Sequence, residues 1–212
     1  MGQVVDLPTR CRAAPNAENG KVAPPRRRPN RESRTREYLT PSEVERLLGA
    51  AGAAGRHGPR DRTLLLLMFR HGLRVSEAVA LRWEQIDLKA GLLHVQRIKN
   101  GVPSTHPLRG PELRALRQLQ RDWPESPYVF VSERGGPMTT SNVRKLIARA
   151  GQQAKLGFSV HPHMLRHACG FKLANDGHDT RALQHYLGHK NINHTVRYTE
   201  MAPDRFKGFW RD

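Results

Sequence analysis

Residues 161–170 read HPHMLRHACG and place three histidines and an arginine within seven positions. Apolar residues recur at Met164, Leu165 and Ala168 with the spacing of one helix face, which predicts a helix that begins at Pro162 and buries that face. The basic residues need a separate explanation, because core packing does not require them. A metal ion, a polar core and an anionic ligand are the three candidates.

His163 and Arg166 lie three positions apart on this helix, so both side chains project from one face and can converge on one ligand. An arginine donates two parallel hydrogen bonds, which suits the oxygens of a phosphate group. His163 and His167 have the spacing of helical zinc ligands, but no glutamate follows His163 as in metalloproteases, and Arg166 between them would repel a cation. The segment therefore favours an anion over a metal ion.

The composition of the whole chain points the same way. Its 212 residues suffice for one domain with a normal core, and 36 lysines and arginines against 19 acidic residues give a net charge of +17. An excess of this size indicates a polyanionic partner, with nucleic acid the first candidate. The longest apolar run, residues 64–69, is too short to cross a bilayer, and the N-terminus lacks the apolar stretch of a signal peptide. We expect a cytoplasmic, nucleoid-associated protein.

Two domains of different character follow from the residue pattern. Residues 1–37 contain five prolines and few large apolar residues, which predicts a disordered basic N-terminal arm. The arm is either a solvated tail or a segment that adds phosphate contacts on DNA. Folded structure begins near residue 38, where Thr40 as N-cap, Pro41 and Glu43 predict a capping box and a helix start.

The fold class expected for residues 38–212 is α+β, mainly α, with a small three-stranded antiparallel sheet on one edge. Alternating apolar residues around KNGVP, residues 99–103, predict a β-hairpin with Lys99 near its tip. The run YVFV, residues 128–131, is predicted to be the third strand. Thr140 is the expected cap of the helix over 142–155, and a last turn is expected over 204–209. The other predicted helices cover 61–71, 75–83, 111–121, 162–176, 180–187 and 192–199.

Six polar residues are not explained by helix or strand propensity: Arg74, Lys99, His163, Arg166, His189 and Tyr198. Arg74 opens an apolar helix, where an unpaired guanidinium would be costly, so it should meet an anionic partner. Positive neighbours favour the phenolate form of Tyr198, and a positioned base can take its proton. Attack on a DNA phosphodiester would expel a sugar hydroxyl, and Lys99 on a hairpin could protonate it.

A resemblance to the tyrosine recombinase (phage integrase) family rests on three stretches: HGLRVSEAVAL at 71–81, HPHMLRHACGFKLA at 161–174 and DTRALQHYLGHKNINHTVRYT at 179–199. The family signature is Arg, Lys, His-x-x-Arg, His or Trp, then Tyr, and this chain has that order within residues 38–210. The words STHPL, HPHMLRH and CGF most resemble the compact fimbrial phase-variation recombinases, which invert a promoter. Those relatives lack a separate DNA-clamping domain.

The resemblance implies a catalytic domain over residues 38–212 and a role for each of the six residues. Arg74 and Arg166 would clamp the scissile phosphate, His163 would act as general acid/base, Lys99 would protonate the leaving 5′-hydroxyl, His189 would bind a nonbridging oxygen, and Tyr198 would form a 3′-phosphotyrosine. Glu77 would orient the first arginine. The bond energy stays in the phosphotyrosine, so neither ATP nor a metal ion is implied. The implied partners are double-stranded DNA, a homotetramer on DNA and accessory DNA-bending proteins, with no membrane.

Several alternatives stay open in the sequence. A DNA-binding regulator without catalysis and type IB topoisomerase-like strand relaxation both fit a basic chain of this kind. Tyr186 competes with Tyr198 as nucleophile, but its place between Leu183 and Leu187 favours packing, and His167 is read as a supporting or core histidine. The hairpin lacks the second lysine and the arginine common in the family, so Lys99 has no substitute. The sequence does not distinguish inversion from integration or excision. It also does not show whether FKGFW at 206–210 packs in its own subunit or on a neighbour.

Overall fold

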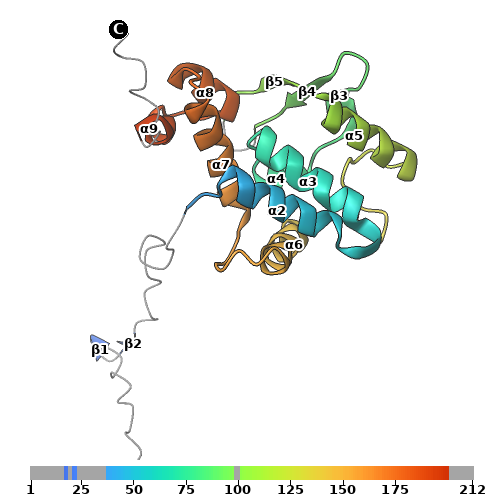
Figure 1. Cartoon of the computed structure of the whole chain (residues 1–212), viewed down its shortest axis with the longest axis horizontal. Coiled ribbons are helices and arrows are strands. Elements are labelled where there is room, and N and C mark those ends of the chain that lie inside the picture. The colour runs from blue at the N-terminus through green and yellow to red at the C-terminus, as the bar shows by residue number, and fades with distance from the viewer. Residues whose placement is uncertain (1–16, 19–20, 23–36, 98–100, 201–212) are drawn as a thin grey trace, which may run out of the picture. The chain divides into compact units, whose positions relative to one another are not determined.

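The computed structural model describes residues 17–18, 21–22, 37–97 and 101–200 (Figure 1). The chain divides into two compact units, Met1–Arg36 and Glu37–Asp212. In the first unit, β1 (Ala17–Glu18) pairs antiparallel with β2 (Lys21–Val22). The rest of the arm predicted over residues 1–37 lies almost wholly outside the described residues. The elements that follow belong to the second unit.

Helices dominate the second unit, as the sequence predicts. In chain order they are α2 (Pro41–Gly52), the short 3₁₀ helix η1 (Gly55–His57), α3 (Gly58–Arg70), α4 (Val75–Val79), the 3₁₀ helix η2 (Trp83–Gln85), α5 (Gly110–Asp122), α6 (Thr140–Gln153), α7 (Pro162–Asn175), α8 (Thr180–Leu187) and α9 (Asn193–Glu200). No helix among the described residues is long and apolar enough to span a membrane.

Helix α7 connects two hydrophobic cores. The larger core gathers buried side chains of α2, α3, α4 and α6 with those of the first half of α7, including Met164 and Leu165. The smaller core joins the second half of α7 to α8 and α9 through residues that include Phe171 and Leu183. Residues near position 166 therefore lie where the larger helical layer meets the C-terminal helices.

A three-stranded antiparallel sheet lines one edge of the helices, with α5 beside it (Figure 1). Its order is β3 (Ile86–Asp87), β4 (Leu92–Val95) and β5 (Ser104–Pro107). The β4–β5 register pairs Leu93 with His106 and Val95 with Ser104, which confirms the predicted hairpin. Residues 98–100 between these strands lie outside the described residues.

The third strand of the sheet is not the one that the sequence predicted. The run 128–131 makes only isolated bridges, Arg82 with Tyr128 and Val131 with Pro137, whereas β3 completes the sheet. Its backbone bonds instead to irregular segments: the Val129 N–H donates to the Leu81 carbonyl at 3.0 Å. A continuous apolar run indicates burial, and Val129 and Phe130 are indeed buried in the larger hydrophobic core.

Some predicted helix limits are also corrected. Helix α4 ends at Val79 rather than near residue 83, because the Arg82 N–H bonds to the Gln85 side chain at 3.0 Å and starts a separate 3₁₀ turn. The cap of α6 is Thr139 rather than Thr140, since the Thr139 hydroxyl accepts from the Asn142 N–H at 3.1 Å. The turn expected over 204–209 lies outside the described residues.

The predicted capping box at the start of α2 is confirmed and gives a test of the fold. The Thr40 N–H donates to Glu43 Oε2 at 2.7 Å, and the Thr40 hydroxyl caps the Glu43 N–H. We expect Thr40→Ala to lower the free energy of unfolding by about 1 kcal/mol, measured by urea titration. The matched control is Ser141→Ala, an exposed position inside α6, which should not lower it. Equal losses in the two variants would contradict the capping role.

Candidate active site

The turn between α3 and α4 positions Arg74. Gly72 in this turn has φ +56°, and a Cβ placed on it would lie 2.5 Å from Leu187 Cδ2, so glycine permits both the turn and the close approach of α8. The Arg74 backbone N–H and guanidinium donate to the Glu77 carboxylate at 2.9 and 2.7 Å. The anionic partner expected for Arg74 is therefore Glu77. The side chain of Arg74 remains 28% exposed and can still meet a ligand.

Arg166 joins this turn to the end of α8. Its side chain is buried and donates to the backbone carbonyls of Gly72 and, at 2.6 Å, of Leu187. Burial, together with the charge of Arg74, lowers the pKa of Arg166 to about 10, so the guanidinium stays charged at neutral pH. A buried cation thus lies between the two turns that precede Arg74 and His189.

His189 follows directly on the left-handed cap of α8, where Gly188 has φ +65°. The ring Nδ1 lies 2.8 Å from the Thr195 hydroxyl on α9, which fixes the orientation of the imidazole. Burial and the nearby Arg166 charge lower the pKa of His189 to about 3, so the ring is neutral at physiological pH. Its ring centroid lies 6.2 Å from that of Tyr198.

Tyr198 on α9 is almost wholly buried against α7. Its hydroxyl lies 2.8 Å from His167 Nδ1, and its ring meets Phe171 edge-on at a centroid distance of 5.0 Å. Burial raises the pKa of Tyr198 to about 12, although the Arg166 charge opposes this, and burial lowers the pKa of His167 to about 3. At neutral pH the protonated hydroxyl therefore donates to a neutral imidazole. From the sequence, His167 was interpreted as a supporting or core histidine. The structure shows that it accepts a hydrogen bond from the Tyr198 hydroxyl.

His163 is exposed in the first turn of α7, and its ring meets the His167 ring edge-on at 4.7 Å between centroids. It is thereby connected to Tyr198 through His167. Arg166 points instead toward backbone carbonyls, so the two side chains expected to converge on one ligand are not aimed at one point here. Lys99 lies outside the described residues, and its role stays a prediction. Within the described ranges, no three histidine, cysteine or acidic side chains are grouped to hold a metal ion.

Arg97 is a residue of this region that the sequence reasoning missed. It continues the inward alternation of Leu93 and Val95, and its side chain is fully buried. Unlike those apolar residues, it carries a charge and forms an ion pair with Glu77 at 2.9 Å. The signal was available, because an arginine in the inward register of a strand requires an anionic or carbonyl partner.

A buried polar chain next to the site was also missed. Glu112 on α5 lies 2.8 Å from His71 Nε2, His71 and His106 face each other through their Nδ1 atoms at 3.1 Å, and Ser104 lies 2.8 Å from His106 Nε2. Each of these hydrogen bonds has a donor and an acceptor when Ser104 donates to His106, His106 to His71 and His71 to Glu112. These hydrogen bonds therefore connect β5 and α5 to His71, the residue that precedes the turn before Arg74.

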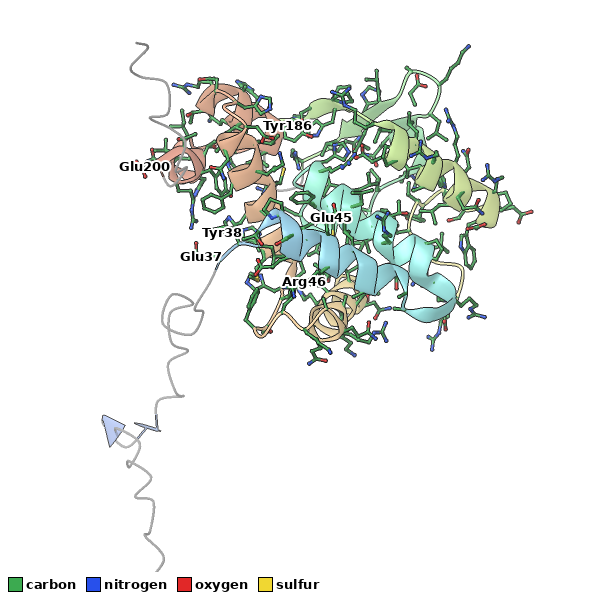
Figure 2. The ribbon with its side chains drawn as sticks, in the orientation of Figure 1. Glu37, Tyr38, Glu45, Arg46, Tyr186 and Glu200 are labelled. Carbon is green, nitrogen blue, oxygen red and sulfur yellow. The ribbon has the colours of Figure 1, made fainter. Side chains whose placement is uncertain are left out.

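Tyr186 packs, as the sequence predicted, and is confirmed in that role. Its ring stacks on His106 at 3.9 Å between centroids, and its hydroxyl donates to the Arg70 carbonyl at 2.9 Å. Figure 2 shows it on the side of α8 that faces β5. Burial raises the pKa of the Tyr186 hydroxyl, as it does for Tyr198, so the packing of Tyr186 and not its pKa distinguishes the two tyrosines.

Comparisons with known proteins show which family the chain resembles. A family model described as the phage integrase family matches residues 37–205. The chain is similar to the type 1 fimbriae regulatory protein FimB of Escherichia coli K12, at 46% identity over 184 residues that cover 84% of this chain and 92% of FimB. It is also similar to FimE of the same strain, at 42% identity over 181 residues that cover 82% and 91%. Among solved structures, XerA recombinase superposes with a TM-score of 0.72 at 25% identity, covering 83% of this chain and 64% of that one.

The contact between Tyr198 and Gly170 gives a first test of the site. A Cβ placed on Gly170 would lie 2.7 Å from the Tyr198 ring, which cannot yield without leaving Phe171 and His167. We expect Gly170→Ala to lower the free energy of unfolding by about 1–3 kcal/mol. In a Tyr198→Ala background the same substitution should cost little, because the ring it meets is gone. Equal losses in both backgrounds, measured by urea titration, would contradict the contact.

The neutral buried histidines give a second test, through the pH dependence of stability. Burial lowers the pKa of His106, His167 and His189 to about 3, against an ordinary value of 6.5. The unfolded chain binds more protons between these values, so the stability is full above pH 6.5 and is lost as the pH falls toward 3. We expect the free energy of unfolding to fall by up to about 1.4 kcal/mol per pH unit for each histidine.

The control for this test compares two single substitutions. His167→Asn removes one buried titrating ring and should reduce the slope of stability against pH between pH 6.5 and 4.5, a window of about two units below the ordinary histidine pKa. His178→Asn changes an exposed histidine and should leave the slope unchanged. The same slope in both variants would show that His167 does not resist protonation in the folded state.

Proposed function

Because this chain belongs to the phage integrase (tyrosine recombinase) family, we propose that it is a site-specific recombinase that cuts and rejoins DNA strands through a 3′-phosphotyrosine at Tyr198. The observation that carries the proposal is the contact of the Tyr198 hydroxyl with a neutral imidazole, next to the guanidinium groups that surround Gly72. Similarity to two fimbrial regulators favours inversion of a DNA segment over integration or excision.

The phosphate is the group that Arg74 and Arg166 would hold. Arg74 is partly exposed, and each terminal nitrogen of Arg166 carries a second N–H that its carbonyl bonds do not use. Guanidinium groups at the two nonbridging oxygens stabilise the added charge of a pentacoordinate transition state. His189, neutral and oriented by Thr195, would donate a further hydrogen bond to one of these oxygens.

In the cleavage step, the Tyr198 oxygen forms a bond to phosphorus and the bond to the 5′-oxygen breaks. The hydroxyl proton moves to a histidine, and His167 with His163 beside it offers a path from the buried hydroxyl to the surface. The leaving 5′-oxygen takes a proton from Lys99. Rejoining reverses these transfers, and because the phosphotyrosine keeps the bond energy, the step needs neither ATP nor a metal ion.

Recombination joins two duplexes by four cleavages, so the proposed assembly is a homotetramer on double-stranded DNA, with accessory DNA-bending proteins as further partners. The basic arm over residues 1–37 would add phosphate contacts that do not depend on sequence. Its action on the chromosome would place the protein at the nucleoid.

A nicked suicide duplex tests the proposal, with a site recovered by binding selection from random DNA. Loss of the nicked fragment prevents rejoining, so a covalent protein–DNA adduct should accumulate with the unaltered chain and fall to background in Tyr198→Phe. Tyr186→Phe should retain the adduct, since loss of its bond to Arg70 costs only about 1 kcal/mol of stability. An adduct that persists in Tyr198→Phe would reject the nucleophile, and no adduct on any selected site would favour a non-catalytic regulator.

A further inference from the structure

Arg97 is a buried cation for which the proposed chemistry has no stated use. It follows β4, and its side chain is 0% exposed. The side chain crosses to the α3–α4 turn, where it donates to Glu77 Oε2 at 2.9 Å and to the carbonyls of His71 and Gly72 at 3.3 and 3.4 Å. It also donates to the Tyr186 carbonyl at 2.5 Å. It therefore contacts the same two turns that Arg166 joins.

The two buried arginines share their acceptors. The Gly72 carbonyl accepts from both guanidinium groups, and the adjacent carbonyls of Tyr186 and Leu187 at the end of α8 accept one each. These carbonyls lie at the C-terminal ends of α3 and α8, which lack partners within the helices and carry partial negative charge. Arg97 and Arg166 thus hold the two helix ends at a fixed separation.

Glu77 connects Arg97 to Arg74. One carboxylate oxygen accepts from the Arg74 guanidinium at 2.7 Å, and the other accepts from Arg97 at 2.9 Å. Burial alone would raise the pKa of Glu77, but the Arg74 backbone N–H and the Arg97 charge outweigh it and lower the pKa below its ordinary value. Without Arg97, Glu77 Oε2 would keep only the Arg74 backbone N–H as a donor and could also draw the Arg74 guanidinium into a two-pronged pair, away from a ligand.

Stability alone does not account well for this arginine. Its Nε has no hydrogen-bond partner among the described residues, so the cost of burying the cation is only partly met. Burial lowers its pKa, against the opposing charge of Glu77. Two glycines make room for the side chain: Cβ atoms placed on Gly101 and Gly188 would lie 2.6 and 2.7 Å from its carbons. The chain therefore accommodates a costly cation beside the two phosphate-binding arginines.

We propose that Arg97 is a positioning residue for strand cleavage, which keeps Glu77 and the ends of α3 and α8 in place so that Arg74 and Arg166 face the scissile phosphate. The inference rests on the proposed function and extends it to a residue outside the six-residue signature. Arg97 is not expected to touch DNA, because each of its terminal nitrogens already donates to two acceptors, whereas each terminal nitrogen of Arg166 donates to one. Its effect should therefore fall on the rate of cleavage and not on DNA affinity.

The experiment compares the full chain with Arg97→Met and Arg97→Lys on two nicked duplexes that carry the selected site. One duplex has the natural phosphodiester at the scissile position, and the other has a methylphosphonate, in which a neutral methyl group replaces one charged oxygen. In both, Tyr198 forms a bond to phosphorus and the 5′-oxygen leaves with a proton. Only the natural phosphate needs both arginines placed against two charged oxygens.

On the natural duplex we expect Arg97→Met to slow adduct formation on the order of 100-fold, the cost of a small misplacement of groups that bind the transition state. Arg97→Lys should recover part of the rate, and the dissociation constant for DNA should not change. On the methylphosphonate the difference from the unaltered chain should shrink to a small fraction of that loss. The control is Arg121→Met, an exposed arginine on α5, which should match the unaltered chain on both duplexes.

Three outcomes would overturn the inference. An equal loss on both duplexes indicates a general packing defect, and an unchanged rate in Arg97→Met excludes any role in cleavage. A loss of DNA affinity that accounts for the slower rate places Arg97 in binding instead. In each of these cases the unaltered chain still forms the adduct, so the proposed function stands, whereas absence of the adduct from the unaltered chain rejects the proposed function as well.

Discussion

A buried guanidinium between two helix ends is the constraint on which the rest of this site depends. Arg166 cannot be buried without acceptors, and it finds them in the carbonyls of Gly72 and Leu187, which close α3 and α8. The turn after α3 leads into Arg74, and the residue after α8's cap is His189. One interaction on α7 therefore fixes the places from which two other candidate groups emerge, at the junction of the two hydrophobic cores.

The same arrangement leaves the region electropositive and its tyrosine protonated. Arg74, Arg97 and Arg166 carry three positive charges against the one negative charge of Glu77, so these four groups together favour an anionic ligand. Burial keeps Tyr198 protonated and His167 neutral, so the hydroxyl donates a hydrogen bond to the imidazole. Glu37 and Tyr38, at the start of the second unit, contact α9 and α7 (Figure 2). Glu37 forms an ion pair with Arg197 on α9, and the Tyr38 ring lies 4.2 Å from the Phe171 ring on α7.

Local signals in the sequence predicted the elements that local chemistry decides. Thr40 and Glu43 predicted the start of α2, because their capping bonds span only three residues. The helix predicted over 180–187 has the same limits as α8. The run 128–131 was wrong as a strand because its neighbours in space, Leu81 and Met138, are set by tertiary packing. Arg97 was not predicted, and its partners lie as far as 89 positions away in the chain, so no local pattern identifies its acceptors. Tyr198 could be chosen by type and order, whereas its bond to His167 required the packing of α9 on α7.

The most direct measurement is the identity of the residue that carries the DNA. Trypsin cleaves after Arg197 and Arg205, so a nucleotide attached to Tyr198 would appear in mass spectrometry on the peptide of residues 198–205. If Tyr198 is the nucleophile, a 3′-linked nucleotide is expected on that peptide and none on residues 182–190, which contain Tyr186. A nucleotide on residues 182–190, or on a serine or histidine elsewhere, would contradict it.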